Sequence, residues 1–194
     1  MTKGRLEAFS DGVLAIVITI MVLELKPPHE PTIESLVPLV PTLLSYLLSF
    51  IYIGIYWNNH HHLFQAVKSV RGGVLWANLH LLFWLSLIPF VTAWMGENNF
   101  ASLPSALYGA VLLGAAVAYW IMVRILLRHH DRESPLARAI GSDRKGTLSM
   151  LCYIAALGLA FVQSWMAWSL YIFVAIIWLV PDSRIERVLE GSKA

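Results

Sequence analysis

The chain has 194 residues, of which 58% are hydrophobic and 13% charged, and its formal net charge is +2 at pH 7. So few polar residues cannot coat a soluble globule, and the composition therefore predicts an integral membrane protein. The small net charge gives no argument for a nucleic-acid partner, and none is expected. Because Cys152 is the only cysteine, a disulfide within the chain is excluded.

A bilayer core of about 30 Å is crossed by about 20 helical residues, and six apolar segments come near this length. We expect an all-α membrane protein with one transmembrane domain over residues 1–194, and spans at about 6–25, 42–64, 74–95, 104–127, 148–162 and 165–180. Pro89 should kink the third span. Gln163 and Ser164 should form a tight turn between the last two spans.

The basic residues predict the orientation of these spans. All but Lys26 lie before the first span, in the loop after the second span, at the end of the fourth span or in the loop after it, or after the last span. The positive-inside rule then places both termini in the cytoplasm, which agrees with an even number of spans. The basic residues on that side are Lys3, Arg5, Lys68, Arg71, Arg124, Arg128, Arg132, Arg138, Arg144, Lys145, Arg184, Arg187 and Lys193.

Polar side chains from three spans should meet at one depth near the cytoplasmic side. An ionisable group such as Asp11 is costly there unless it has a partner or borders water. Asp11 is therefore expected to point into its own subunit. Consecutive helical residues point about 100° apart, so His60, His61 and His62 cannot all reach one hydrogen-bond network. Which of these histidines takes part stays open. The expected hydrogen-bond network comprises Arg5, Ser10, Asp11, Trp57, His60, His61, Asn78 and His80.

A second face of the first span carries Gly12, Ile16, Thr19 and Leu23. Ile16 lies five residues after Asp11, which is about 140° round the helix. When Asp11 points into its own subunit, this stripe points nearly the opposite way. Two interpretations stay open, because such a stripe either lines a pore or packs against another helix.

The start of the first span resembles a known family. Arg5-x-x-x-Phe9-Ser10-Asp11 is similar to the R-x-x-x-F-S-D signature of the transmembrane protein 175 family, potassium channels of endosomes and lysosomes with shorter bacterial relatives. Further similar positions are Trp57, His60, His61, Leu63, Phe64, Asn78 and Leu87-Ile88-Pro89-Phe90. The resemblance covers spans one to three, whereas spans four to six match only in number and hydropathy.

The resemblance implies a potassium channel in which the first helices line a central pore. In the family an apolar side chain five residues after the aspartate forms the constriction, and that position is Ile16 here. Thr19, Leu23 and Gly12 would line the same pore. The vertebrate chains carry two six-span repeats and this chain carries one, which implies a homotetramer. No enzymatic activity, cofactor or bound metal is expected, and K⁺ would be the permeating ion near Ile16 and Thr19.

An apolar ring offers no oxygen ligands, so it passes the ion that sheds water most easily, and this favours K⁺ over Na⁺. The expected partners are copies of the chain, the lipid bilayer and K⁺, and the expected location is a bacterial inner cell membrane. Two alternatives stay open. A secondary transporter would need internal repeats and broken helices near mid-membrane, and the sequence shows neither clearly. A metal-handling membrane protein would use the cluster of Asp11, histidines and asparagine.

Overall fold

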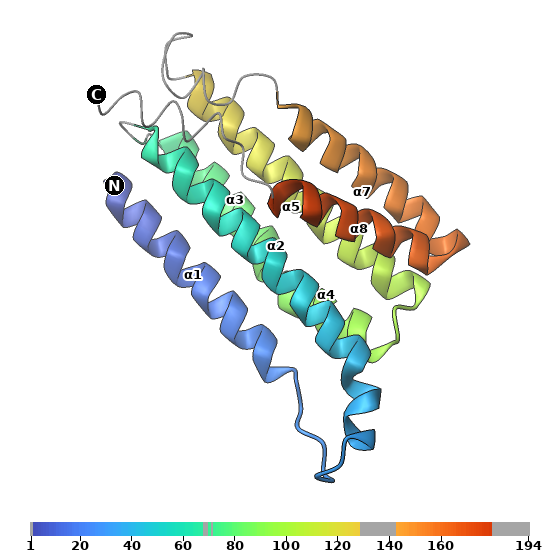
Figure 1. The fold of residues 1–194 in the computed structure, drawn as a ribbon. Coiled ribbons are helices and arrows are strands. Elements are labelled where there is room, and N and C mark those ends of the chain that lie inside the picture. Colours follow the sequence, from blue (N-terminus) through green and yellow to red (C-terminus); the bar gives the residue numbers. More distant parts are fainter. Residues whose placement is uncertain (1, 68–69, 71, 129–142, 180–194) are drawn as a thin grey trace.

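The computed structural model describes residues 2–67, 70, 72–128 and 143–179, and this part of the chain forms a bundle of helices (Figure 1). The all-α prediction is confirmed for the described residues. The elements are α1 (Lys3–Leu23), the 3-10 helix η1 (Glu34–Leu39), α2 (Val40–Gln65), α3 (Gly72–Ser86), α4 (Ile88–Glu97), α5 (Ser102–Arg128), α7 (Arg144–Val162) and α8 (Ser164–Leu179).

Five stretches of these helices are long and apolar enough to cross a membrane: α1, η1 with α2, α3 with α4, α5 and α7. The helix α8 is also apolar but has 16 residues in the described part of the chain. The expected end of the sixth span, at residue 180, lies outside the described residues. Most of the basic residues that predict the orientation also lie outside them, namely Lys68, Arg71, Arg132, Arg138, Arg184, Arg187 and Lys193.

The third apolar stretch is interrupted where the sequence predicts a kink. Pro89 has no N–H and cannot donate to the carbonyl of Leu85, so the regular ladder fails at this point. The helix breaks at Leu87, whose N–H bonds to the carbonyl of Trp84 at 3.2 Å. The two halves have different neighbours, since α3 packs chiefly against α5 and α4 chiefly against α2.

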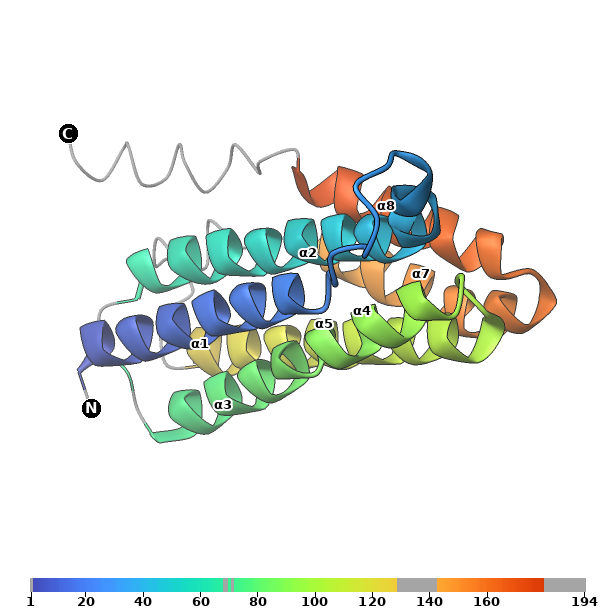
Figure 2. The same cartoon turned by 90° about the horizontal axis from the view of Figure 1, so that it is seen from below.

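The helix α1 lies at one edge of the bundle and packs against α2, α3 and α4 (Figures 1 and 2). At the other side, α7 and α8 form an antiparallel pair connected by Gln163 alone. Asp143 starts this pair, since its carboxylate accepts from the N–H of Gly146 at 2.9 Å and caps α7. Near the other end of α8, Trp178 Nε1 donates to Ser149 Oγ at 2.8 Å.

A buried hydroxyl cluster joins the middle helices. Ser49 Oγ lies 2.7 Å from Thr92 Oγ1 and 3.0 Å from Tyr108 Oη, which links α2, α4 and α5. Tyr52 Oη donates to the carbonyl of Tyr171 at 2.6 Å, and Tyr171 Oη donates to the carbonyl of Ser105 at 3.0 Å. All five side chains are buried, so these bonds satisfy groups that water cannot reach.

Glycine allows the close approach of α3 and α5. A Cβ atom built on Gly114 would overlap the ring of Trp84, whereas one on Gly158, on the exposed side of α7, would meet nothing within 4 Å. We expect Gly114→Ala to destabilise the protein by about 1–3 kcal/mol through overpacking. Gly158→Ala should be neutral or stabilising by up to about 1 kcal/mol, because alanine favours helix. Thermal unfolding in detergent measures both, and equal midpoints for the two variants would contradict the expectation.

Candidate functional site

The helix α1 buries one stripe against the rest of the chain. Its buried side chains are spaced by three or four residues, as one face of an α-helix requires. The buried residues are Leu6, Ser10, Leu14, Val17 and Met21. The opposite face is left uncovered by this chain, with exposed fractions of 59% for Ile16 and 76% for Leu23. On a membrane-spanning helix, an apolar face so exposed contacts lipid, another helix or a pore.

All four residues of the sequence-predicted stripe lie on this uncovered face. Gly12 and Thr19 are exposed like Ile16 and Leu23, and a Cβ atom on Gly12 would meet nothing within 4 Å. Thr19 Oγ1 donates to the carbonyl of Ile16 at 2.9 Å. This bond fixes the hydroxyl against its own helix and leaves the lone pairs of the oxygen available to accept.

Behind this face, three side chains from three helices form a buried chain of hydrogen bonds. His60 Nε2 on α2 lies 2.8 Å from Asn78 Oδ1 on α3, with the imidazole N–H as donor. Asn78 Nδ2 donates to Ser10 Oγ on α1 at 2.9 Å, and that hydroxyl donates to the carbonyl of Leu6 at 2.9 Å. None of the three side chains is more than 2% exposed. The bonds therefore tie α1 to α2 and α3 at a fixed rotation.

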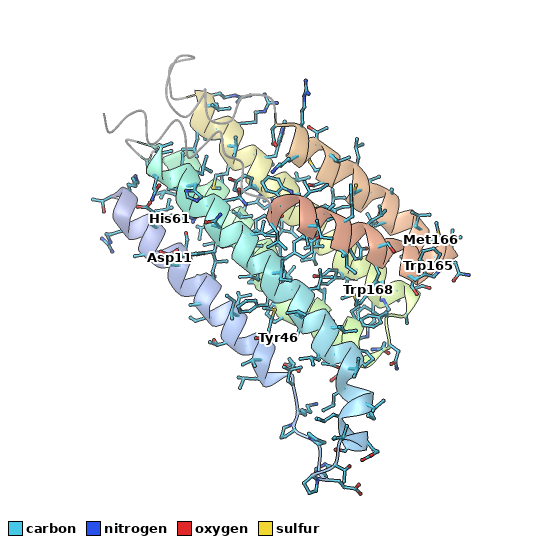
Figure 3. All side chains as sticks on the ribbon, viewed as in Figure 1. Asp11, Tyr46, His61, Trp165, Met166 and Trp168 are labelled. Carbon is cyan, nitrogen blue, oxygen red and sulfur yellow. The ribbon has the colours of Figure 1, made fainter. Side chains whose placement is uncertain are left out.

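Asp11 forms a separate contact at the surface. Trp57 Nε1 donates to Asp11 Oδ1 at 3.0 Å, and the indole stacks on the ring of His61 with centroids 6.1 Å apart. Gln65 Nε2 donates to His61 Nε2 at 2.7 Å. Asp11 on α1 and His61 on α2 are labelled in Figure 3, toward the end of the bundle at which α1 begins. The network thus consists of two parts, one buried and one exposed.

Asp11 contacts its own subunit through Trp57, as expected, but it is exposed in the single chain, and Ser10 takes the buried position. The physical reason is desolvation, since a small hydroxyl is buried at lower cost than a carboxylate. The stripe with Ile16 remains on the uncovered face, since Ser10 and Ile16 are about 120° apart round the helix.

Two further members of the expected network lie elsewhere. His80 is exposed, and its Nε2 accepts from Trp84 Nε1 at 3.0 Å, so it does not contact Asn78 or Ser10. Arg5 is exposed and lines a surface hollow of about 320 Å³ beside Asn78. The partners Trp84 and Gln65 were not expected, although each follows its histidine by four residues, which is the spacing of helical neighbours.

A groove of about 550 Å³ runs between α1 and the broken α3 and α4. Its apolar walls include Ile16, Ile20 and Phe90, and it also contains Glu24 and Glu97 at the end where α1 and α4 both end. Lys26 Nζ lies 3.9 Å from Glu97 Oε1, and both side chains are largely exposed. The groove therefore connects an acidic end to the uncovered face of α1 at Ile16.

Among the described residues, no group of three or more histidine, cysteine, aspartate or glutamate side chains is placed to hold a metal ion. The site thus consists of buried, hydrogen-bonded polar side chains beneath an exposed apolar face of α1. The class of protein that these features define is a multi-pass α-helical membrane protein.

Comparison with known proteins identifies the family. A family model described as endosomal/lysosomal potassium channel TMEM175 matches residues 5–89. A protein of Chryseobacterium sp. (strain P1-3), named a potassium channel, is 54% identical over 190 residues, which cover 98% of this chain and 99% of the relative. The chain belongs to the TMEM175 family.

The fold agrees with a solved structure of this family. The crystal structure of a lysosomal potassium-selective channel TMEM175 homolog from Chamaesiphon minutus matches with a TM-score of 0.78 and 31% identity, covering 92% of this chain and 96% of that chain. The human relative, named an endosomal/lysosomal proton channel, is 35% identical over 96 residues, or 43% of this chain and 19% of that protein.

Proposed function

We propose that four copies of this chain form a potassium channel in which Ile16 is the constriction. The observation that carries the proposal is the apolar stripe of α1, which the rest of the chain leaves uncovered while the buried Ser10 side of the same helix is packed. The bacterial relatives named potassium channels support conduction of K⁺. The channel would act in a cell membrane as a passive conductor and not as an enzyme.

The arrangement of α1 suits a central pore. Because α1 lies at the edge of the bundle, a fourfold axis beside it gathers four copies of this helix without disturbing the remaining helices. Gly12, Ile16, Thr19 and Leu23 then line the path. A ring of four isoleucines offers no ligands to replace water, so K⁺ passes more readily than Na⁺, which holds its hydration shell more tightly.

The buried trio supports the constriction indirectly. Ser10, His60 and Asn78 fix the rotation of α1, and Ile16 lies about 9 Å further along the same rigid helix. A turn of α1 about its own axis would break both bonds and carry Ile16 away from the pore axis. We therefore assign these three residues a structural role.

Charge also suits a cation pathway. Glu24 and Glu97 lie at one end of the groove that reaches Ile16, and Lys26 offsets the charge of Glu97 in part. The carboxylate of Glu24 near a pore mouth would raise the local concentration of K⁺. By the positive-inside rule we assign this end to the outer side and both termini to the cytoplasm.

Purified protein in liposomes tests the function. With a K⁺ gradient and a K⁺ ionophore control, we expect dissipation of the gradient at a rate that rises with the gradient and does not saturate. Addition of EDTA should leave the flux unchanged, because no bound metal takes part. Flux that vanishes with EDTA would contradict the channel proposal and favour metal handling by the Asp11, histidine and asparagine cluster.

A secondary transporter is the second candidate, and one observation favours it. Transporters commonly have interrupted helices at their binding sites, and the third apolar stretch breaks at Leu87 beside the groove. In the same liposomes a transporter would show flux that saturates with K⁺ and needs a second ion on the other side. The number of K⁺ ions moved per second by one protein also separates the two classes.

A further inference from the structure

A small cavity lies at the end of the bundle where α1 begins, remote from the stripe of α1. It is enclosed by the later parts of α2, α5 and α8 and the first turns of α7, and it measures about 40 Å³. Six of its thirteen lining residues are aromatic, and one carries a carboxylate. The residues that matter here are Tyr56, Tyr119, Trp120, Asp143, Tyr153 and Trp178.

The wall of this aromatic cavity favours a cation. The faces of tyrosine and tryptophan rings carry negative partial charge and attract ammonium groups, and Lys145 Nζ already lies 5.9 Å from the ring centroid of Trp178. Asp143 adds a full negative charge, and among the described residues its carboxylate accepts one hydrogen bond, from the N–H of Gly146 to Oδ1. Within the described residues, no lysine or arginine nitrogen lies within 4.0 Å of this carboxylate. A second oxygen thus remains to accept from a ligand.

The rim of the cavity carries the opposite charge. Arg124 is exposed, and its guanidinium carbon lies 5.0 Å above the ring of Trp120, which itself lines the cavity. A planar guanidinium held in this way is suited to a phosphate. The negative charge of Asp143 repels a phosphate from the cavity itself, so the phosphate would lie outside, at Arg124. A ligand that satisfies both groups therefore has an ammonium inside and a phosphate outside.

Size narrows the choice of ammonium. One water-sized atom needs about 10–15 Å³. The cavity of about 40 Å³ therefore holds about three heavy atoms. An aminoethyl arm has three heavy atoms, one nitrogen and two carbons, whereas a trimethylammonium group is bulkier. One side of the cavity, at Asp143 before α7 and at Trp178 late in α8, lies near the ends of the apolar helices, where tryptophans mark the level of lipid headgroups.

We propose that this aromatic cavity binds the headgroup of a phosphoethanolamine lipid, with the ammonium on Asp143 and the phosphate on Arg124. The lipid would bridge α5 and α7, whose connecting segment lies outside the described residues. The proposal goes beyond ion conduction and does not depend on it, because binding is measured without any flux.

Thermal unfolding of the full-length protein in detergent tests it, with dioctanoyl phosphatidylethanolamine, phosphatidylcholine and phosphatidylglycerol as probes. We expect the ethanolamine lipid to raise the unfolding midpoint by several degrees, and the other two to raise it much less. Free phosphoethanolamine should give little shift, because it lacks the acyl chains. An equal shift with free phosphoethanolamine would overturn the lipid as the source, and equal shifts with all three lipids would overturn the site.

Asp143→Asn is the decisive variant, because asparagine still caps α7 but carries no charge. It should lose the shift caused by the ethanolamine lipid, whereas Glu7→Gln, at the same end of the bundle on α1, should keep it. Arg124→Gln changes an exposed side chain, so it should fold and should bind the lipid at least several-fold more weakly. An undiminished lipid shift in Arg124→Gln, or in a folded Asp143→Asn, would overturn the proposal.

Discussion

Replacing Ile16 by asparagine is expected to produce a leaky channel with reduced preference for K⁺ over Na⁺. Four amide side chains at the constriction would supply oxygen and N–H groups, so the ring would stay wet and hydrated Na⁺ would no longer be held back. We expect several-fold faster Na⁺ flux with K⁺ flux equal to or above that of the unchanged protein. Parallel K⁺ and Na⁺ flux assays in liposomes measure the ratio.

The matched control is Ile176→Asn on α8. Ile176 is 55% exposed and Ile16 is 59% exposed, so both substitutions place the same amide on a comparably uncovered apolar surface. Ile176 lies on α8, which packs chiefly against α7, α2 and α5. If Ile176→Asn changed the ratio of K⁺ to Na⁺ flux as much as Ile16→Asn, the assignment of the pore to α1 would be refuted.

Loss of Asn78 is expected to destabilise the fold more than any other polar substitution in α3. Asn78→Ala leaves the buried N–H of His60 without its acceptor and Ser10 Oγ without its donor. Each buried group left unpaired costs about 1–3 kcal/mol. For a chain of this size the sum corresponds to a fall in the unfolding midpoint of about 4–24 °C, measurable by fluorescence in detergent.

Asn58→Ala on α2 provides the comparison, because Asn58 is exposed and makes no side-chain hydrogen bond within the described part of the chain. It should change the midpoint by no more than about 2 °C, as exposed substitutions cost about 0.5 kcal/mol or less. Similar midpoints for Asn58→Ala and Asn78→Ala would show that the buried trio does not hold α1 in place.

The all-helical fold followed from the sequence because apolar runs of this length admit few other structures in a bilayer. The break before Pro89 was also predictable, since a missing N–H is a property of the residue itself. The contacts of Ser10 and Asn78 could be anticipated, because polar groups at one depth find one another when no water is present.

The remaining contacts depend on rotation about the helix axes, which the sequence does not specify. Ser10 and Asp11 are neighbours, so a turn of about 100° decides which is buried, and packing of Leu6 and Leu14 selects Ser10. His80 had a nearer partner in Trp84, one turn along its own helix. The hydroxyl cluster around Ser49 was not predicted, although serine within an apolar run was its signal.

The single-residue link at Gln163 has a consequence for how the protein is made. With so short a connection, α7 and α8 cannot enter the bilayer far apart in time, and we expect the translocon to release them together as a helical hairpin. Until that hairpin docks, Tyr171 lacks both the carbonyl of Ser105 and the hydroxyl of Tyr52. Those two bonds therefore form only at the last assembly step, and they favour completion of the bundle over a persistent intermediate that lacks the C-terminal pair.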